Sequence, residues 1–96
     1  MKILVLNCGS SSIKYKLYDM ADESVLAQGG AERVGLDEAF VKVTLKDGSK
    51  EKIMHDMPDH KEGVKFVFQL LLDPKYGALK SLDEIDAVGR ARSKNP

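Results

Sequence analysis

The sequence has very few of the features that mark secreted or membrane proteins. It contains a single cysteine, Cys8, so no disulfide can form within the chain, which suits a reducing compartment. No stretch approaches the roughly 20 consecutive apolar residues of a membrane helix. The apolar run at residues 3–6 is also too short for the core of a signal peptide. We therefore expect a cytoplasmic protein with no membrane partner.

An excess of charge of either sign is also missing. Fifteen Lys and Arg residues balance 15 Asp and Glu residues, and both signs are spread along the chain. The composition therefore predicts no nucleic-acid partner, and any anion site must be formed locally. With 96 residues the chain is at most one small domain with a modest core.

The apolar residues that are present predict a β-meander. Residues 3–6 form a continuous apolar run, which is typical of a central strand covered on both faces. Residues 13–18 alternate between apolar and polar, as in a strand with one buried face. Residues 25–34 favour a third strand, in which Gly29-Gly30 indicates a bulge or a close backbone approach. We expect these three strands to be antiparallel.

A second hairpin and one main helix follow. Residues 41–45 alternate up to Asp47-Gly48, which suits a tight turn, and a returning strand extends to about Met54. Asp59 and Glu62 have capping-box spacing, and the apolar residues of 64–71 recur at helical spacing. The helix should end at Asp73-Pro74, which gives an α/β fold.

The end of the sequence changes character. Ser81 and Glu84 repeat the capping-box spacing before a short helical turn, and residues 85–88 suit the start of another strand. The last seven residues, "RARSKNP", contain no large apolar side chain. We therefore predict a disordered tail at residues 90–96.

The stretch that carries chemistry is "NCGSSSIK", residues 7–14, between the first two expected strands. Gly9 permits a close approach, and the three serines that follow add short donors that could bind a phosphate. Lys14 adds a positive charge, and the Asn7 oxygen could hold a water of Mg²⁺. The loop lacks the second glycine of the Walker type. A solvated polar turn is the alternative.

Other reactive residue types have simpler explanations. Cys8 ends an apolar strand with no histidine nearby in sequence, which favours a small buried residue over a reactive thiol. His55 and His60 are five residues apart and have no accompanying ligand pattern, so surface or capping roles are favoured over metal binding. Capping and solvation explain the acidic residues of 83–86.

The stretch "ILVLNCGSSSIKYKLYDM" resembles the opening of the acetate kinases, relatives of the sugar kinases, Hsp70 and actin. The resemblance continues through "ESVLAQGGAERVG", "PDHKEGVK" and "SLDEIDAVG", so it covers about residues 1–89. It implies the amino-terminal part of an actin-like, ribonuclease H-like kinase domain. The implied activity is reversible ATP-dependent phosphorylation of acetate, giving acetyl phosphate and ADP, with Mg²⁺ as cofactor. The full-length parent is expected to be a homodimer.

The resemblance also implies residue roles. Asn7 matches a residue associated with Mg²⁺, Ser10 and Ser12 match residues that contact nucleotide phosphates, and Lys14 matches a lysine associated with ATP. The family has an arginine that contacts the carboxylate substrate where this chain has Ala91. We therefore expect no catalytic or substrate-binding residue in the chain.

The family pattern stops after residue 89, so we expect an amino-terminal fragment, arising from a frameshift, a truncated gene or a cloning remnant. Such a chain should be inactive alone. Two alternatives stay open. One is a truncated phosphate-binding or interaction module without enzymatic activity, and the other is a fragment of a propionate or butyrate kinase, since these share the serine loop.

Overall fold

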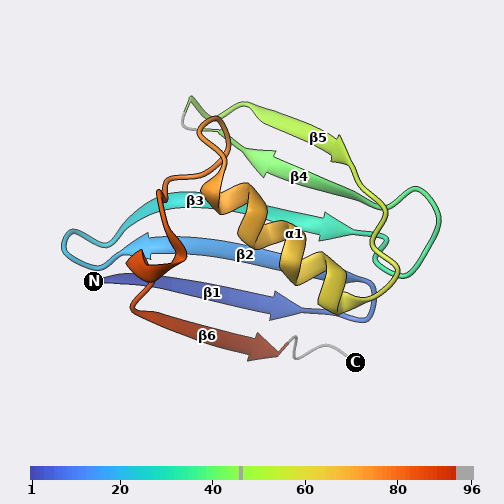
Figure 1. Ribbon diagram of the computed structural model, residues 1–96, viewed down its shortest axis with the longest axis horizontal. Coiled ribbons are helices and arrows are strands. Elements are labelled where there is room, and N and C mark those ends of the chain that lie inside the picture. Colours follow the sequence, from blue (N-terminus) through green and yellow to red (C-terminus); the bar gives the residue numbers. More distant parts are fainter. Residues whose placement is uncertain (46, 93–96) are drawn as a thin grey trace.

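One six-stranded sheet and one layer of helix make up the fold (Figure 1). The structure, a computed structural model, describes residues 1–45 and 47–92. The strand order across the sheet is β5-β4-β3-β2-β1-β6. The elements along the chain are β1 (Lys2–Cys8), β2 (Ser12–Asp19), β3 (Ser24–Glu32), β4 (Phe40–Thr44), β5 (Lys50–Met54), α1 (His60–Leu72), the 3₁₀ helix η1 (Leu82–Glu84) and β6 (Ala87–Arg92).

The predicted meander and second hairpin are confirmed. Strands β1 to β5 pair antiparallel with their neighbours, while β6 pairs parallel with β1 after the crossover through α1. No helix in the part of the chain that the structure describes has the length and apolar character to cross a membrane.

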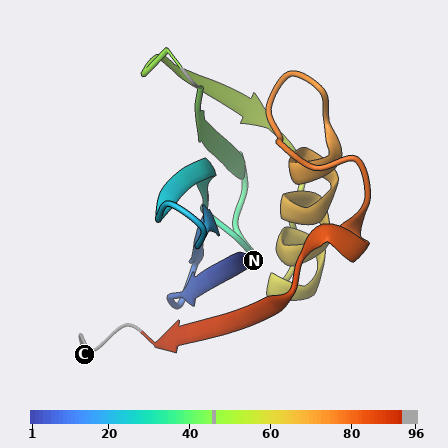
Figure 2. The ribbon, with the colours of Figure 1, turned by 90° about the vertical axis from the view of Figure 1, so that its left-hand side faces the viewer.

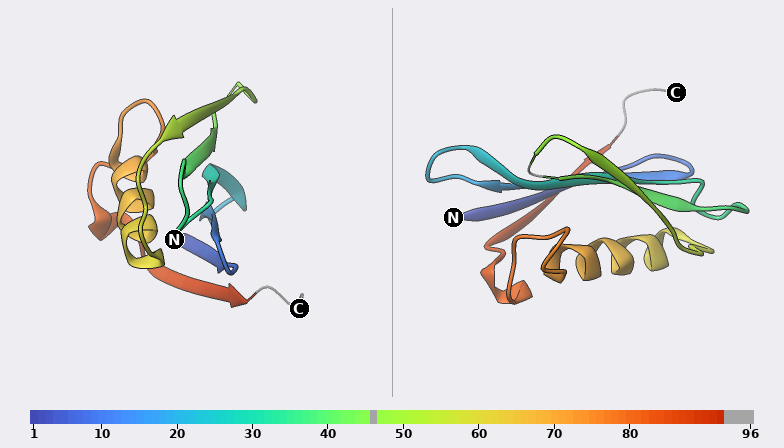
Figure 3. Two further views of the ribbon diagram at one scale, coloured as in Figure 1. Left: turned by 90° about the vertical axis from the view of Figure 1, so that its right-hand side faces the viewer. Right: turned by 90° about the horizontal axis from the view of Figure 1, so that it is seen from above.

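The two faces of the sheet differ sharply. Among the described residues, α1 and η1 both lie on one side of the sheet and leave the other side bare (Figures 2 and 3). β1 is an interior strand, as expected, and among the described residues it is covered on one face only. Leu4 and Leu6 are buried, whereas Ile3 and Val5 are only half-buried because nothing described packs on their side.

The core lies between the sheet and α1. The alternation in β2 places Ile13, Tyr15 and Leu17 toward the helix, and all three are almost completely buried. From α1 the buried side chains include Val67 and Leu71, at the helical spacing that the sequence predicts.

Helix α1 begins and ends where the sequence predicts. The Asp59 side chain accepts a hydrogen bond from the Glu62 N–H at 2.9 Å, and Asp73 caps the other end. A glycine inside a helix costs about 1 kcal/mol relative to alanine, and packing explains Gly63. A Cβ atom there would lie 2.7 Å from Ile13 Cδ1, so glycine allows the helix to approach the sheet closely.

The two alternatives for Gly29-Gly30 are now decided. The register of β2 with β3 is irregular between Leu17 and Tyr18, not at the glycines. At Gly29 an added Cβ would lie 2.7 Å from both the Lys42 carbonyl oxygen and the Tyr15 hydroxyl. The glycine therefore marks a close approach between neighbouring strands and the tyrosine ring.

The sequence analysis placed the start of the disordered tail too early in the chain. β6 runs from Ala87 to Arg92 and pairs with β1 from Ile3 to Cys8. The backbone of β1 supplies hydrogen-bond partners along this edge, so residues 90–92 continue the strand although their sequence contains no large apolar residue. The rest of the predicted tail, residues 93–96, lies outside the described residues.

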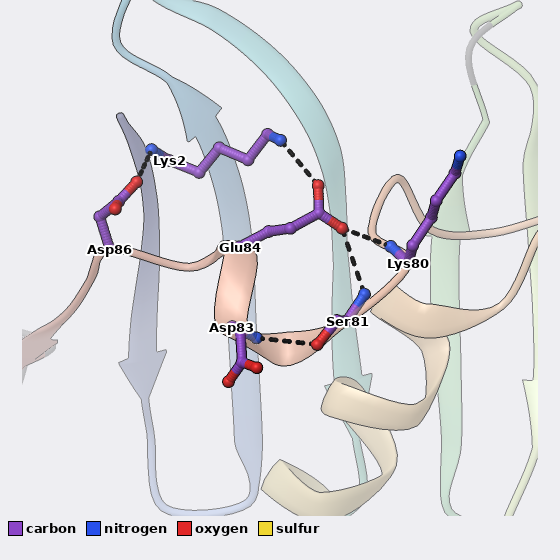
Figure 4. Close-up of polar contacts among 6 residues, drawn as sticks. All are labelled: Lys2, Lys80, Ser81, Asp83, Glu84 and Asp86. Atoms are coloured by element: carbon purple, nitrogen blue, oxygen red, sulfur yellow. Dashed lines mark hydrogen bonds and ion pairs between the residues drawn. The ribbon is translucent and has the colours of Figure 1, made fainter.

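A polar network joins the start of β1 to η1 (Figure 4). The Lys2 N–H donates to the Asp86 carboxylate at 2.8 Å, and the Asp86 N–H donates to the Lys2 carbonyl at 2.8 Å. The Lys2 ammonium donates to Glu84 at 2.9 Å, and the other Glu84 oxygen accepts from the Lys80 and Ser81 N–H groups. The Lys2 hydrogen bond, followed by these backbone donors, lowers the pKa of Glu84 to about 2. Capping therefore accounts for Glu84, as predicted, whereas the Asp86 carboxylate binds the backbone at the start of β1.

Candidate functional site

The serine loop, residues 9–12, connects β1 to β2 and lies beside the start of α1 (Figure 1). Three hydrogen bonds fix its backbone. The Gly9 N–H donates to the Ser12 carbonyl at 2.8 Å, and the Val34 N–H donates to the Ser11 carbonyl at 2.9 Å. The third joins the His60 Nε2 to the Gly9 carbonyl oxygen at 2.7 Å. The loop is therefore anchored to the rest of the fold through its carbonyl groups.

The donor groups of the loop stay available. Within residues 1–45 and 47–92, the N–H groups of Ser10 and Ser11 donate no hydrogen bond. A Cβ atom at Gly9 would lie 2.7 Å from the Ser12 hydroxyl oxygen, so glycine leaves room for this hydroxyl in its present position. Free N–H groups and hydroxyls on a short loop form a site suited to an anion.

Asn7 and Lys14 lie directly opposite each other in the β1–β2 ladder. Both line the bare side of the sheet, where Lys14 is exposed and Asn7 is half-buried. The two ion pairs found among the described residues are Lys2–Glu84 and Lys75–Glu51, so no described carboxylate pairs with the Lys14 ammonium. The register also places Ala91 of β6 opposite Asn7 on its other side. The four predicted positions, Asn7, Ser10, Ser12 and Lys14, therefore gather at one end of the sheet.

A groove of about 810 Å³ extends from this end along the bare face of the sheet. Its walls are rich in positive charge, with one carboxylate, that of Glu32, among the lining residues. The basic residues that line it are Lys14, Lys16, Lys42 and Lys50. The fold thus concentrates cations on one face of a chain whose total charge is balanced.

The described residues suit a hydrated metal ion better than a fully protein-bound one. No group of three or more His, Cys, Asp or Glu residues that could hold a metal occurs in the described part of the chain. Asn7 offers a neutral amide oxygen, with no described partner, beside the serine loop. Mg²⁺ keeps much of its water shell and takes phosphate oxygens as ligands, so one such oxygen fits this ion.

The two histidines have separate structural roles. The His55 ring stacks on Phe66 with 3.7 Å between centroids and 2° between planes, which is a packing role. His60 contacts the serine loop, a role that the sequence analysis missed. The residues in contact are 51 positions apart, and nothing in the sequence links the helix start to the loop. Cys8 is half-buried, in accordance with its position at the end of β1.

Comparisons with known proteins agree with this architecture. The model of the acetokinase family matches residues 2–92. Acetate kinases of Bacteroides thetaiotaomicron and Phocaeicola vulgatus are each 60% identical over 89 residues. The crystal structure of Porphyromonas gingivalis acetate kinase superposes with a TM-score of 0.90 at 54% identity. That of a Francisella tularensis propionate kinase superposes with a TM-score of 0.74 at 29% identity.

These matches cover nearly all of this chain and a small part of each relative. The matched region is 93% of this chain in all four cases, but 22% of each acetate kinase and 21% of the propionate kinase. The family match includes β6, where the sequence analysis expected it to stop at residue 89. The chain therefore belongs to the acetokinase family.

Proposed function

We propose that this chain supplies the phosphate-binding wall of an acetate kinase, which transfers a phosphoryl group between ATP and acetate. The observation that carries the proposal is the serine loop, in which the N–H groups of Ser10 and Ser11 have no partner among the described residues, together with Lys14, which pairs with no described carboxylate. Acetate is favoured over propionate because the acetate kinases compared are 54–60% identical, while the propionate kinase is 29% identical.

The residue roles follow from donor chemistry. Ser10 and Ser12 donate to the nucleotide phosphates, and the Lys14 ammonium neutralises charge on the same group. The Asn7 oxygen holds a water of the Mg²⁺ ion. When bound, that ion supplies charge neutralisation to the transferring phosphoryl group. Positioning and charge neutralisation supply most of the catalysis in such reactions, so these donors suit the task.

The described residues form one wall of the site and no acetate pocket. Ala91 lies opposite Asn7, where the family resemblance implies an arginine for the carboxylate substrate. We therefore infer that the 96-residue chain binds MgATP without turnover. The same resemblance supports a cytoplasmic location, and a homodimer for the full-length relatives.

Titration calorimetry with MgATP tests the binding role. We expect Lys14→Ala and Asn7→Ala each to weaken binding, by roughly ten- to a hundredfold for Lys14, since a charge-assisted hydrogen bond contributes about 1.5–3 kcal/mol. Lys65→Ala is the matched control, because Lys65 is an exposed lysine in α1, the helix that lies on the other side of the sheet from the groove (Figure 3). Equal affinity in all variants would contradict the assignment.

A hydroxamate assay for acetyl phosphate tests the inactivity of the chain alone. No product should form with the purified chain, ATP and acetate. Turnover that is lost on Asn7→Ala or Lys14→Ala would overturn this part of the proposal. Binding without turnover is the result that we expect for a chain that supplies one wall of the site.

A further inference from the structure

The contact between His60 and the serine loop shows which ring nitrogen of His60 carries a hydrogen. His60 is the first residue of α1, and its Nε2 lies 2.7 Å from the Gly9 carbonyl oxygen. A carbonyl oxygen only accepts hydrogen bonds, so the Nε2 of His60 must carry the hydrogen. The residue is half-buried, at the junction of α1 with the end of β1.

His60 is not needed for the helix start. Asp59 is the N-cap residue, and its side chain already accepts from the Glu62 N–H at 2.9 Å. A metal-binding role also lacks support, since the described residues contain no suitable ligand group and Nε2 is already engaged. The contact with Gly9 is therefore the feature of His60 that needs an explanation.

Peptide geometry links this contact to the anion site. The Gly9 carbonyl and the Ser10 N–H belong to one planar trans peptide unit, in which they point in opposite directions. A hydrogen bond that holds the carbonyl toward α1 therefore turns the Ser10 N–H away from the helix. This lock matters because glycine gives the neighbouring peptide more freedom to rotate than any other residue.

Two of the other loop carbonyls are also engaged, whereas that of Ser10 accepts no hydrogen bond from the described residues. The Ser11 carbonyl accepts from Val34 N–H, and the Ser12 carbonyl accepts from Gly9 N–H. Carbonyl oxygens repel an anion, so hydrogen bonds that hold them away from the site favour phosphate binding. His60 is the one side-chain donor that performs this task in the part of the chain that the structure describes.

We propose that His60 is a positioning residue for the phosphate-binding loop: its Nε2–H holds the Gly9 carbonyl, and so directs the Ser10 N–H toward the nucleotide phosphates. This inference rests on the proposed function. It assigns His60 no contact with ATP and no part in proton transfer.

The test compares two substitutions by MgATP titration of the 96-residue chain. His60→Leu removes the donor, and we expect a roughly tenfold loss of affinity, the usual effect of one hydrogen bond worth about 1.4 kcal/mol. His60→Gln offers an amide N–H near the place of Nε2 and should restore most of the affinity. His55→Leu makes the same chemical change at a histidine that packs on Phe66, and should leave affinity unchanged.

The outcomes separate this inference from the proposed function. If the wild-type chain binds MgATP and His60→Leu binds equally well, the positioning role is wrong and the proposed function stands. Equal losses in His60→Leu and His60→Gln would indicate a packing role and would also overturn the inference. Absence of wild-type binding would contradict the proposed function and the inference together.

A measurement on the unaltered chain covers the case in which His60→Leu fails to fold. Nitrogen-15 NMR of the imidazole ring should show hydrogen on Nε2, and the Ser10 amide signal should shift on addition of inorganic tripolyphosphate. A ring with hydrogen on Nδ1 alone would contradict the contact. An unchanged Ser10 amide signal at saturating tripolyphosphate would contradict its role in the loop.

Discussion

Two adjacent rows of residues in the sheet differ in their surroundings. One row faces α1 and contributes to stability, and the other faces the bare side and contains candidate binding residues. The register aligns Leu6, Tyr15, Gly29 and Val43 in one row, and Asn7, Lys14, Gly30 and Lys42 in the next. Leu6, Tyr15 and Val43 of the first row belong to the core, while all four residues of the second row line the basic groove. One residue of shift along the strands therefore changes a core position into a candidate binding position.

The largest expected effect separates the two faces directly. Leu17 is completely buried, so Leu17→Ala should lower the free energy of unfolding by about 2–5 kcal/mol through lost burial and a residual cavity. Lys16, the preceding residue, is exposed on the other face, and Lys16→Ala should change stability by about 0.5 kcal/mol or less. Urea denaturation of both variants provides the measurement. Similar losses of unfolding free energy would contradict the division between a core face and a groove face.

A bulkier residue at the contact between α1 and the sheet should have the next largest effect. The Cβ atom of Gly63→Val would lie 2.7 Å from Ile13 Cδ1, and overpacking of this kind usually costs about 1–3 kcal/mol. Gly89→Ala is the control, because an added Cβ there meets no atom within 4 Å. Thermal unfolding of the two variants should differ clearly, and equal melting temperatures would contradict the close approach.

Acid should weaken the polar network that joins the helical layer to β1. The folded pKa of Glu84 is about 2, below its ordinary value of 4.5, so its contribution is complete above about pH 5 and is lost as the pH falls toward 2. Glu84→Gln should flatten the dependence of unfolding free energy on pH over this range. Glu23→Gln is a control, since Glu23 is exposed in the β2–β3 turn. An unchanged slope in Glu84→Gln would contradict the role of the network.

The smallest effect concerns a polar atom on the core side. The Tyr15 hydroxyl is buried without a hydrogen-bond partner among the described residues, and burial raises the pKa of this group to about 12. Removing an unsatisfied polar atom should be neutral or slightly stabilising, so we expect Tyr15→Phe to change stability by about 0.5 kcal/mol or less. A loss above about 1 kcal/mol in urea denaturation would reveal a partner for this hydroxyl.

The sequence predicted the features that depend on local pattern. Alternation in residues 13–18 gave the buried face of β2, and Asp59 with Glu62 gave the start of α1. Features that depend on contacts across the chain could not be predicted in this way. Examples are the hydrogen bond from His60 to Gly9 and the packing reason for Gly63, since both join residues about 50 positions apart.

The strand at the end of the described chain shows another limit of pattern reading. Residues 90–92 carry no large apolar side chain, yet they belong to β6, because pairing with β1 uses the backbone. For the candidate site, the motif and the family resemblance predicted the four residues, whose roles stay predictions, and the structure places them at one end of the sheet. It did not show that the carbonyl groups of the loop are held by Val34 and His60.

The most direct test of the central claim is a map of amide shifts in the nitrogen-15 NMR spectrum of the chain during titration with MgATP. We predict saturable shifts concentrated in residues 7–14, with the largest at Ser10 and Ser11, whose N–H groups have no described partner. Lys14→Ala should lower the affinity for MgATP, while the same amides still shift. A binding site centred on the α1 side of the sheet, or no saturable shift at all, would contradict the account.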